Sequence, residues 1–554
     1  MMDPAEAPKP KTFMGLDFST QQLKALVLGE DLKLLQEVVV HFDSELPEFR
    51  THGGVVEGSN GSISSPVVMW IKAVDLVLDK LRVAGTDFSA VAAVSGSGQQ
   101  HGSVWWKRGA AETLNNLDAT RFLHNQLTVS IFSKPNAPVW LDSTTTLQCN
   151  NLEEAVGGAQ RLADLTGSRA YERFTGNQIA KVYTDLPDIF GNTEHISLVS
   201  SFGCSLLLGR YAPLDYSDAS GMNLFNIRTK TWDEQCLKAC AVGLRSLLGE
   251  AVPSNTVVGN ISNFYVERYG FSPDCHVVAF TGDNPSSLAG MCVGVGDVAV
   301  SLGTSDTLFL SLQEPTPGLE GHVFVSPIDP DAYMGMLCFS NGSLAREAVR
   351  DKCAQGSWEV FSELLDSTPR GNFGNIALHY SVREICPPLL GVHRYNKARE
   401  RVSRFSSQEV EVRALVEGQM LARRLHANKL GYHTEKCRVL ATGGASKNVS
   451  LLQVMADVFS APVYTMDVSN SASLGAAYRA KHALAEGAAY KDVIAGPAFK
   501  LAAKPAPEAA KVYGQMLERL EACENALLAA TGAKSKSSTT DRSSTTSDVK
   551  QQEQ

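Results

Sequence analysis

The sequence lacks the patterns that mark several common protein classes. No uninterrupted apolar run approaches the ~18 residues that a membrane-spanning helix requires. The 11 cysteines include no CxxC pair and no spacing typical of metal ligands. The net charge of -9 is spread along the chain without a block of Lys or Arg. We therefore expect no membrane and no nucleic acid as partners, and reduced thiols in a cytoplasmic protein.

The two ends of the sequence also lack the features of folded or targeting segments. The first ten residues have neither the basic region nor the apolar region of a signal peptide. We expect residues 1–11 to be a flexible N-terminus. Residues 531–554 are rich in Ser and Thr and poor in apolar residues, which predicts a disordered tail. Just before this tail, Val512, Met516, Leu520 and Leu527 recur at helical spacing.

What remains is large enough for more than one domain and has a mixed α/β pattern. The chain has 554 residues, of which 44% are hydrophobic. The clearest unit is "CRVLATGGASKNVSLLQVMADVFSAPVYTM", where residues 438–441 predict a strand and Gly443 and Gly444 a turn. Residues 448–459 then predict an amphipathic helix and residues 463–466 a second strand. This is the pattern of a βαβ unit.

Two similar segments indicate that the chain has two halves of related plan. "FMGLDFSTQQLKALVLG" at 13–29 and "VAVSLGTSDTLFLSL" at 298–312 both predict a hairpin whose turn is made of small polar residues. Each half also contains a strand that ends in glycines, "AVSGSG" in the first and "VLATGGAS" in the second. We expect the boundary between the halves near residues 281–295.

The glycine-rich motifs do not match the common nucleotide-binding fingerprints. A Walker A pattern is absent, and "GVGDVA" at 294–299 leads into a strand, whereas the Rossmann fingerprint opens a helix. Backbone N–H groups of a hairpin turn can still bind phosphate, although both turns could equally be ordinary tight turns.

Asp17 lies in the first hairpin and raises the question of a cation. A carboxylate beside a phosphate-binding turn is repulsive unless Mg²⁺ lies between them. Ser19 and Thr20 offer donors to a phosphate, and Gly15 leaves room for a ligand. The alternative is an edge-strand Asp17 that faces solvent.

Two polar motifs suggest a site for a polyhydroxyl ligand. In "FTGDNPSSLAGM" at 280–291, Asp283 is either a helix N-cap or a general base that accepts a proton from a substrate hydroxyl. A helix N-terminus is expected to lower the pKa of this carboxyl. In "SGSGQQHGS" at 95–103, His101 follows a glycine turn and could be a structural hydrogen bonder. Together with Asp283 and Asn284, His101 fits recognition of a sugar.

These residues resemble the FGGY family of carbohydrate kinases over roughly residues 13–482. The motifs that carry the resemblance are "GLDFSTQ", "LDYSDASGMNLFNIRTKTWDE" at 214–234, "TGDN", "SLGTSDTLF", and "ATGGASKN" followed by "SNSASLGAAYRA", the last pair closing the nucleotide site. The resemblance implies an α/β, two-domain, actin-like (ribonuclease-H-like) ATPase fold with the active site in the inter-domain cleft. It implies a sugar-binding N-terminal domain at 12–284 and a nucleotide-binding C-terminal domain at 285–530.

The resemblance also implies residue roles. Asp283 is the catalytic base, and Asp17 holds Mg²⁺. The residues implied to hold the sugar are His101, Arg173, Asp283 and Asn284. The residues implied to bind ATP are Ser19, Thr20, Gly303, Thr304, Trp358, Gly443, Gly444, Ala445 and Asn448. The sequence departs from many members at "VWLDSTTTLQC", where no Arg follows Trp140 and Asp142, so the role of that Arg falls to Arg173, with Arg169 nearby.

Within the family, "QQHG" combined with "GDN" is most similar to xylulose kinases of the eukaryotic (plant-type) form. The implied reaction is the ATP-dependent phosphorylation of D-xylulose to D-xylulose 5-phosphate by a monomer or homodimer. The alternatives are a kinase of another ketose or polyol such as ribulose, and a non-catalytic actin-like ATPase scaffold.

Overall fold

The computed structural model describes residues 10–58, 60–433, 437–466, 470–496 and 498–541. The chain divides into two compact units that interleave along the sequence. The first unit comprises Met1–Val295, Phe309–Gly335 and Asp467–Ala498, and the second comprises Gly296–Leu308, Met336–Met466 and Phe499–Gln554. The domain limits predicted from the sequence, with a boundary after residue 284, stay a prediction. The compact units differ from them, because three separate stretches of chain build the first unit.

The first unit is built on a seven-stranded sheet whose central strand is β1 (Thr12–Phe18). The strand order is β15-β16-β6-β1-β2-β3, with β17 paired to β6. β1 is parallel to β6 (Val91–Gly98) and antiparallel to β2 (Gln22–Leu28), so the predicted first hairpin is confirmed. The remaining strands are β3 (Leu34–His41), β15 (Val257–Asn260), β16 (His276–Val278) and β17 (Thr281–Gly282).

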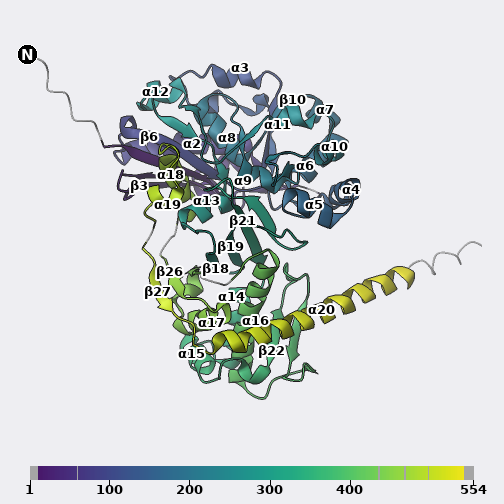
Figure 1. The fold of residues 1–554 in the computed structure, drawn as a ribbon. Helices are drawn as coiled ribbons and strands as arrows, with labels where there is room; N and C mark the ends of the chain where they lie inside the picture. The colour runs from purple at the N-terminus through teal and green to yellow at the C-terminus, as the bar shows by residue number, and fades with distance from the viewer. Residues whose placement is uncertain (1–9, 59, 434–436, 467–469, 497, 542–554) are drawn as a thin grey trace, which may run out of the picture. The chain divides into compact units, whose positions relative to one another are not determined.

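Helices cover both faces of this sheet, which explains why β1 is an almost continuous apolar run. Met14, Leu16 and Phe18 belong to a large core with residues of α2 (Val67–Val83) and α8 (Val199–Leu208). Phe13 packs instead with Ala480 of α18 (Ser471–Ala483). In Figure 1 the yellow-green α18 lies against the purple sheet of this unit.

The glycines of β1 and α18 allow backbones to approach closely. A Cβ at Gly15 would lie 2.1 Å from the carbonyl oxygen of Ser473 on α18. A Cβ at Gly475 would lie 1.8 Å from the carbonyl oxygen of Ser286 on α13 (Asp283–Gly290). The expectation that Gly15 leaves room for a ligand is therefore wrong, because α18 already occupies that space.

Smaller elements complete the first unit. They are α1 (Phe42–Glu45), β4 (Val56–Glu57), β5 (Ile63–Pro66), β7 (Ser103–Lys107), α3 (Ala110–Asn115), β8 (Phe132–Lys134), β9 (Asn136–Pro138), α4 (Thr146–Val156), α5 (Ala159–Thr166), α6 (Thr175–Asp185), α7 (Pro187–Gly191), β10 (Thr193–Leu198), β11 (Leu214–Asp215), α9 (Tyr216–Ala219), β12 (Phe225–Asn226), β13 (Thr231–Trp232), α10 (Glu234–Cys240), α11 (Leu244–Leu248), β14 (Ala251–Val252), α12 (Asn263–Tyr269), β20 (His322–Val325) and α19 (Tyr490–Val493).

The second unit contains the βαβ pattern that the sequence predicts. β25 (Val439–Thr442) is parallel to β26 (Val463–Thr465), and α17 (Val449–Phe459) connects them. They belong to a sheet of order β20-β21-β19-β18-β25-β26-β27. β18 (Val298–Leu302) and β19 (Asp306–Leu312) are neighbours in this sheet, as the second predicted hairpin requires. The division between the units falls within β19 and β21 (Tyr333–Phe339).

The long helix α16 (Gln408–Lys429) is buried along most of its length and packs against α14, α15, α17 and α20. The other elements of this part are α14 (Ser343–Cys353), α15 (Trp358–Asp366), β22 (Ile376–Tyr380), β23 (Gly391–Tyr395), β24 (Arg401–Val402), β27 (Lys500–Ala503) and α20 (Ala509–Asp541).

The C-terminal helix is confirmed, with Met516 and Leu520 buried. α20 continues to Asp541, inside the segment 531–554 that the sequence predicts to be disordered, and residues 542–554 lie outside the described residues. The disorder of the tail stays a prediction. The predicted flexible N-terminus also falls mostly outside the described residues, which begin at residue 10.

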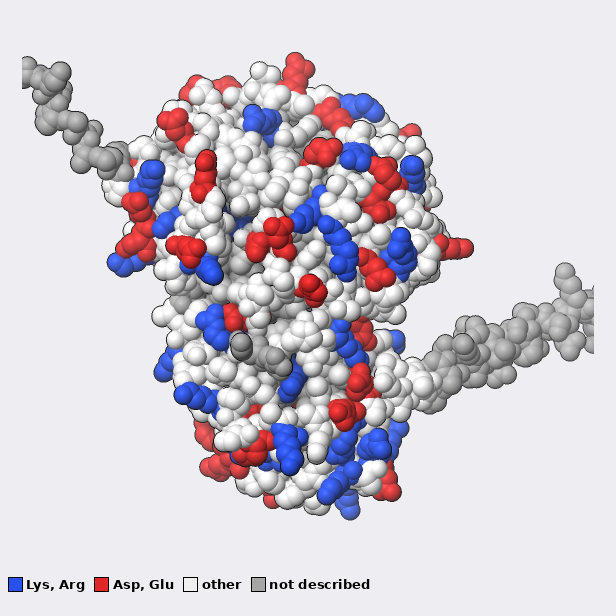
Figure 2. Space-filling view, in the orientation of Figure 1, with Lys and Arg blue, Asp and Glu red and all other residues white. Residues whose placement is uncertain are grey.

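Charged side chains of both signs are mixed on the visible face of the molecule (Figure 2). On the face shown in Figure 2, Lys and Arg side chains are interspersed with Asp and Glu. Among the helices of the described part of the chain, none combines the length and the apolar character needed to cross a membrane.

Candidate active site

Asp17 lies at the buried end of β1 and not on an edge strand, so the reading of Asp17 as a solvent-facing acid is wrong. Its side chain is only 7% exposed. The Ser19 hydroxyl donates to Oδ2 at 2.6 Å, and the Ser97 hydroxyl on β6 donates to Oδ1 at 2.8 Å. Burial raises the pKa of Asp17, while these two hydrogen bonds and the charge of Lys24 oppose the rise.

Asp283 lines the same cavity as Asp17. This cavity belongs to the first unit and has a volume of about 280 Å³. Its walls come from the first hairpin, the start of α13 and the start of α18, and its lining residues are Asp17, Ser19, Gln22, Lys24, Asp283, Asn284, Ser287, Asn470, Ser471, Ala472 and Ser473. Two residues more than 260 positions apart in the sequence therefore meet in one polar pocket.

The environment of Asp283 differs from the one that the sequence predicts. The N-cap of α13 is Gly282, and Asp283 is the first helical residue, so the reading of Asp283 as an N-cap is wrong. Its Oδ1 accepts from the backbone N–H of Asn284 at 2.8 Å. Burial and, second, the negative charge of Asp17 raise the pKa of Asp283 to about 7. The lowering of the Asp283 pKa expected from the helix N-terminus is thus outweighed by burial and by Asp17. A carboxylate with a pKa near neutrality accepts a proton more readily than one with an ordinary pKa.

The two acids fit a magnesium ion bound largely through water. No group of three or more His, Cys, Asp or Glu that could hold a metal occurs in the described residues. Mg²⁺ usually takes only one or two protein carboxylates and keeps several waters. Asp17 and Asp283 supply two carboxylates in one cavity, and burial raises the pKa of both. A divalent cation there would offset the repulsion between them.

His101 does not line this cavity, and its ring is held neutral by burial and by Arg173. Its Nδ1 donates to the carbonyl oxygen of Gly221 at 2.8 Å, and the ring stacks on Phe174 at 4.4 Å between centroids. Burial and the nearby Arg173 lower the pKa of His101 to about 3. The backbone of His101 has a positive φ of 72°, an uncommon conformation that functional sites often hold. Nε2 is the remaining acceptor of the neutral ring.

Arg173 lies with His101, whereas Arg169 points to a different partner. The Arg173 guanidinium donates from Nη2 to Nε2 of His322 at 2.6 Å and lies 4.8 Å from the centre of the Tyr171 ring. Arg169 forms an ion pair with Glu153 at 3.7 Å. The geometry therefore favours Arg173 over Arg169 as the sugar-facing arginine.

Asn284 connects the two motifs that the sequence singles out. Its Nδ2 donates to Oε1 of Gln100 at 3.0 Å. Asp218, a buried acid next to Gln100, accepts from the Ser200 hydroxyl at 2.5 Å. "QQHG" and "GDN" thus belong to one hydrogen-bonded network.

Sequence reasoning missed three polar residues of this region. Lys24 lines the cavity with Asp17, His322 holds Arg173, and Asp218 contacts Gln100. The pattern "DYSDASG" drew attention to the segment of Asp218, but no local signal marks Lys24 or His322. Lys24 is the cross-strand neighbour of Asp17 in the first hairpin, whereas His322 meets Arg173 from 149 positions away in the sequence.

The second unit contains a larger and more apolar cavity of about 760 Å³. The predicted residues Gly303, Thr304, Trp358, Gly444, Ala445 and Asn448 all line it. Gly443 does not; its φ of 82° and the 2.6 Å from its ideal Cβ to the Leu302 carbonyl oxygen show a glycine needed for the turn. A cavity of this size is typical of a small-molecule site.

Two residues of this cavity have well-defined partners. Asn448 is the N-cap of α17, accepting from the N–H of Leu451 at 3.0 Å and donating to Ser362 at 3.0 Å. Trp358 begins α15 and is 37% exposed, with the Arg350 guanidinium 4.7 Å from its ring centre. An exposed aromatic ring on a cavity wall can stack on a planar base.

The remaining predicted ATP contacts, Ser19 and Thr20, lie in the first unit. Ser19 lines the cavity of the acids, and the Thr20 hydroxyl accepts from the Trp140 ring N–H at 2.9 Å. The segment "SNSASLGAAYRA" was expected to close the nucleotide site. Of its described residues, Asn470–Ser473 line the cavity of Asp17 and Asp283, and the role of the segment at the nucleotide site stays a prediction.

Comparisons with known proteins agree with this arrangement. The profile of the FGGY family of carbohydrate kinases, N-terminal domain, matches residues 134–290, and that of the C-terminal domain matches residues 298–484. A xylulose kinase of Rattus norvegicus is 54% identical over 529 residues, covering 95% of this chain and 98% of the relative. Xylulose kinase 2 of Arabidopsis thaliana is 48% identical and covers 86% and 88%.

The solved structures support the fold. The ligand-bound xylulose kinase of Lactobacillus acidophilus aligns with a TM-score of 0.76 at 19% identity, covering 94% of this chain and 99% of that one. A xyloylose kinase of Brucella ovis aligns with a TM-score of 0.75 at 22% identity, covering 94% of this chain and 99% of that one. The expected two-domain, actin-like α/β fold is confirmed. The chain belongs to the FGGY family of carbohydrate kinases.

Proposed function

We propose that this protein is a xylulose kinase that transfers the γ-phosphoryl group of ATP to D-xylulose, giving D-xylulose 5-phosphate and ADP. The observation that carries the proposal is full-length similarity to proteins named xylulose kinase, at 54% and 48% identity. The meeting of Asp17 and Asp283 in one polar cavity supports it, because a kinase needs a carboxylate for the acceptor hydroxyl and a place for a cation.

Asp283 is the general base. The attacking hydroxyl oxygen forms a bond to the γ-phosphorus, the bond from that phosphorus to the bridging oxygen breaks, and the hydroxyl proton passes to Asp283. A pKa raised to about 7 suits this role near neutral pH. Asn284 fixes the carboxylate through its N–H.

His101, Arg173 and Asn284 bind the sugar. A neutral His101 accepts a hydrogen bond from a sugar hydroxyl, and Arg173 donates to sugar oxygens. His322 holds the Arg173 guanidinium in place, and Phe174 supports the His101 ring. Rigid donors and acceptors of this kind discriminate sugars by the position of each hydroxyl.

Asp17 would hold Mg²⁺ through water, in the cavity that it shares with the base Asp283. When bound, the ion neutralises phosphate charge, which dominates the catalysis of phosphoryl transfer. Ser19 and Thr20 contribute donors to the phosphates from the first hairpin.

The apolar cavity of the second unit binds the adenosine part of ATP. Trp358 stacks on the adenine, Gly444, Ala445 and Asn448 line the other side, and Gly443 shapes the turn before them. Gly303 and Thr304 offer backbone N–H groups to the phosphates.

We also propose that the protein acts in the cytoplasm as a monomer or homodimer. Nine of the 11 cysteines are buried, which suits reduced thiols in a reducing compartment.

The proposal is tested with the purified protein, Mg-ATP and a panel of D-xylulose, D-ribulose and glycerol in a coupled assay of ADP release. We expect kcat/KM for D-xylulose to exceed the other two by at least about tenfold. Preference for D-ribulose or glycerol would assign a different substrate to the same chemistry. ATP hydrolysis that no sugar stimulates would favour the ATPase scaffold.

A further inference from the structure

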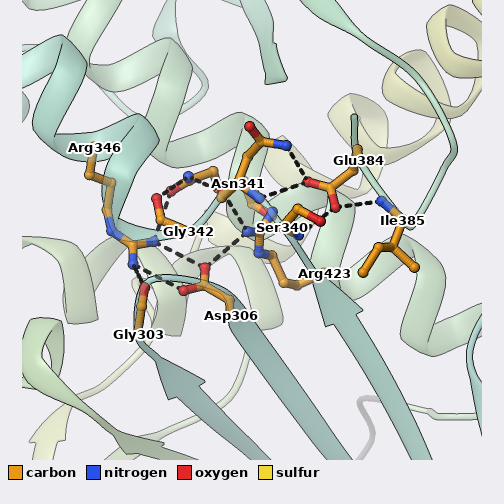
Figure 3. Close-up of polar contacts among 10 residues, drawn as sticks. Gly303, Asp306, Ser340, Asn341, Gly342, Arg346, Glu384, Ile385 and Arg423 are labelled. Carbon is orange, nitrogen blue, oxygen red and sulfur yellow. Dashed lines mark hydrogen bonds and ion pairs between the residues drawn. The ribbon is translucent and has the colours of Figure 1, made fainter. Parts of the chain in front are cut away.

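The hairpin turn of the second unit rests on a fully buried carboxylate that faces two arginines. Asp306 follows the turn at Gly303–Ser305 and is 0% exposed. Arg346 of α14 binds it with two hydrogen bonds of 3.0 Å, and Arg423 of α16 adds a third of 2.9 Å (Figure 3). Both guanidinium groups are almost completely buried.

This cluster is joined to the backbone of the turn. Nη2 of Arg346 donates to the carbonyl oxygen of Gly303 at 3.4 Å. Nη2 of Arg423 donates to the carbonyl oxygen of Asn341 at 3.2 Å. The segment that begins at Asn341 in turn binds the hairpin turn. The N–H of Gly342 donates to the carbonyl oxygen of Thr304 at 3.2 Å, and that of Ser343 donates to the carbonyl oxygen of Gly303 at 2.8 Å.

Gly342 shows how closely this segment and the turn approach each other. A Cβ at Gly342 would lie 2.6 Å from the carbonyl oxygen of Thr304 and 2.7 Å from that of Gly303. The position of the turn is therefore set by the buried cluster and by one glycine.

Two buried acids and two buried arginines meet in this region, but only Asp306 binds the arginines directly. One carboxylate binds two guanidinium groups, and the Nε atoms of Arg346 and Arg423 are buried without a hydrogen-bond partner in the described residues. The nearby acid Glu384 accepts instead from the N–H groups of Ser340 and Asn341 (Figure 3). A buried charge is costly unless an opposite charge compensates it.

Arg346 also lines the 760 Å³ cavity together with Gly303 and Thr304. The guanidinium of Arg346 thus lies directly behind the turn that faces this cavity.

We infer that Arg346 and Arg423 are positioning residues for the nucleotide phosphates: with Asp306 they fix the Gly303–Thr304 turn and keep the Arg346 guanidinium beneath it. The inference rests on the proposed function of the cavity as the nucleotide site. The ligand chemistry it specifies is a di- or triphosphate, because adenosine alone brings no negative charge to this turn.

The test compares Arg423→Met with Arg413→Met, a matched change on the same helix. Arg413 is also buried and paired, with Glu417 at 2.7 Å, but has no contact with Asp306. Binding of ADP and of adenosine to the full chain in Mg²⁺ is measured by calorimetry, together with KM for both substrates and the melting temperature.

We expect Arg423→Met to weaken ADP binding by about tenfold or more and to raise KM for ATP. Adenosine affinity and KM for the sugar should change less than about twofold. Arg413→Met should lower the melting temperature while ADP affinity stays within about twofold of the wild type.

A loss of melting temperature in Arg423→Met with unchanged ADP affinity would overturn the inference and leave the cluster as packing alone. If Arg423→Met does not fold, Gly342→Ala takes its place, because it displaces the turn without changing any charge. That variant should also lose ADP affinity and keep adenosine affinity, and equal binding of ADP would again overturn the inference. A wild-type chain that binds no ADP would contradict the proposed function itself.

Discussion

At the scale of single residues, the two acids of the first unit show what a sequence motif contains and what it omits. The types and positions of Asp17 and Asp283 were predictable, since each stands in a pattern with its own chemistry. The pKa of Asp283 was predicted in the wrong direction, because burial depends on how α13 and α18 pack around the carboxyl and no local pattern reports that packing. His322 illustrates the same limit, because β20 brings it to Arg173 from 149 positions away.

The raised pKa of Asp283 predicts how its removal changes stability with pH. In the folded chain the pKa of Asp283 is about 7, against 3.8 for an unperturbed Asp. Between these values the folded state holds a proton that the unfolded state has lost, so stability falls as pH rises and the cost is fully present above pH 7. In metal-free buffer, Asp283→Asn should therefore be more stable than the wild type by about 1–2 kcal/mol at pH 8.

Urea unfolding at pH 5 and pH 8 measures this difference, which should shrink at the lower pH. Asp31→Asn is a control of opposite sign, because the hydrogen bond from Lys33 lowers the pKa of that exposed carboxyl. Equal stabilisation of Asp283→Asn at both pH values would show that Asp283 is not a buried acid of raised pKa.

At the scale of elements, local signals predicted most strands and helices but not where they dock. The two hairpins and the βαβ unit were predictable from glycine turns and from the period of apolar residues. The docking of α18 on β1 was not predictable, because it joins segments about 450 residues apart in the sequence. The close approach depends on glycines whose packing role the motif alone does not reveal. The same docking brings Asn470 and Ser473 to the cavity of Asp17.

Gly15→Ala tests whether this close approach positions the cavity. Its Cβ would lie 2.1 Å from the Ser473 carbonyl oxygen, so α18 must shift. We expect a loss of about 2–3 kcal/mol in the free energy of unfolding and a fall in kcat. Gly514→Ala on α20 is the matched control, because its Cβ meets no atom within 4 Å, and it should be neutral or slightly stabilising. Wild-type stability of Gly15→Ala would contradict the close packing.

At the scale of the whole molecule, the duplicated plan was readable from the two similar hairpins, and the family from a few motifs. The way the units interleave was not readable, because stretches 309–335 and 467–498 join the first unit through contacts with segments far away in the sequence. A sequence followed from end to end suggests one boundary between two domains. The limits of a compact unit are instead decided by packing between segments that are distant in the sequence.

The central claim, that Asp283 is the base of a phosphoryl transfer to D-xylulose, is tested most directly by the steady-state kinetics of Asp283→Asn. The amide keeps the shape of the side chain but cannot accept the proton. We predict that kcat with D-xylulose and Mg-ATP falls by about 10²–10⁴-fold while KM for D-xylulose changes only a few fold. A kcat within about threefold of the wild type would contradict the account.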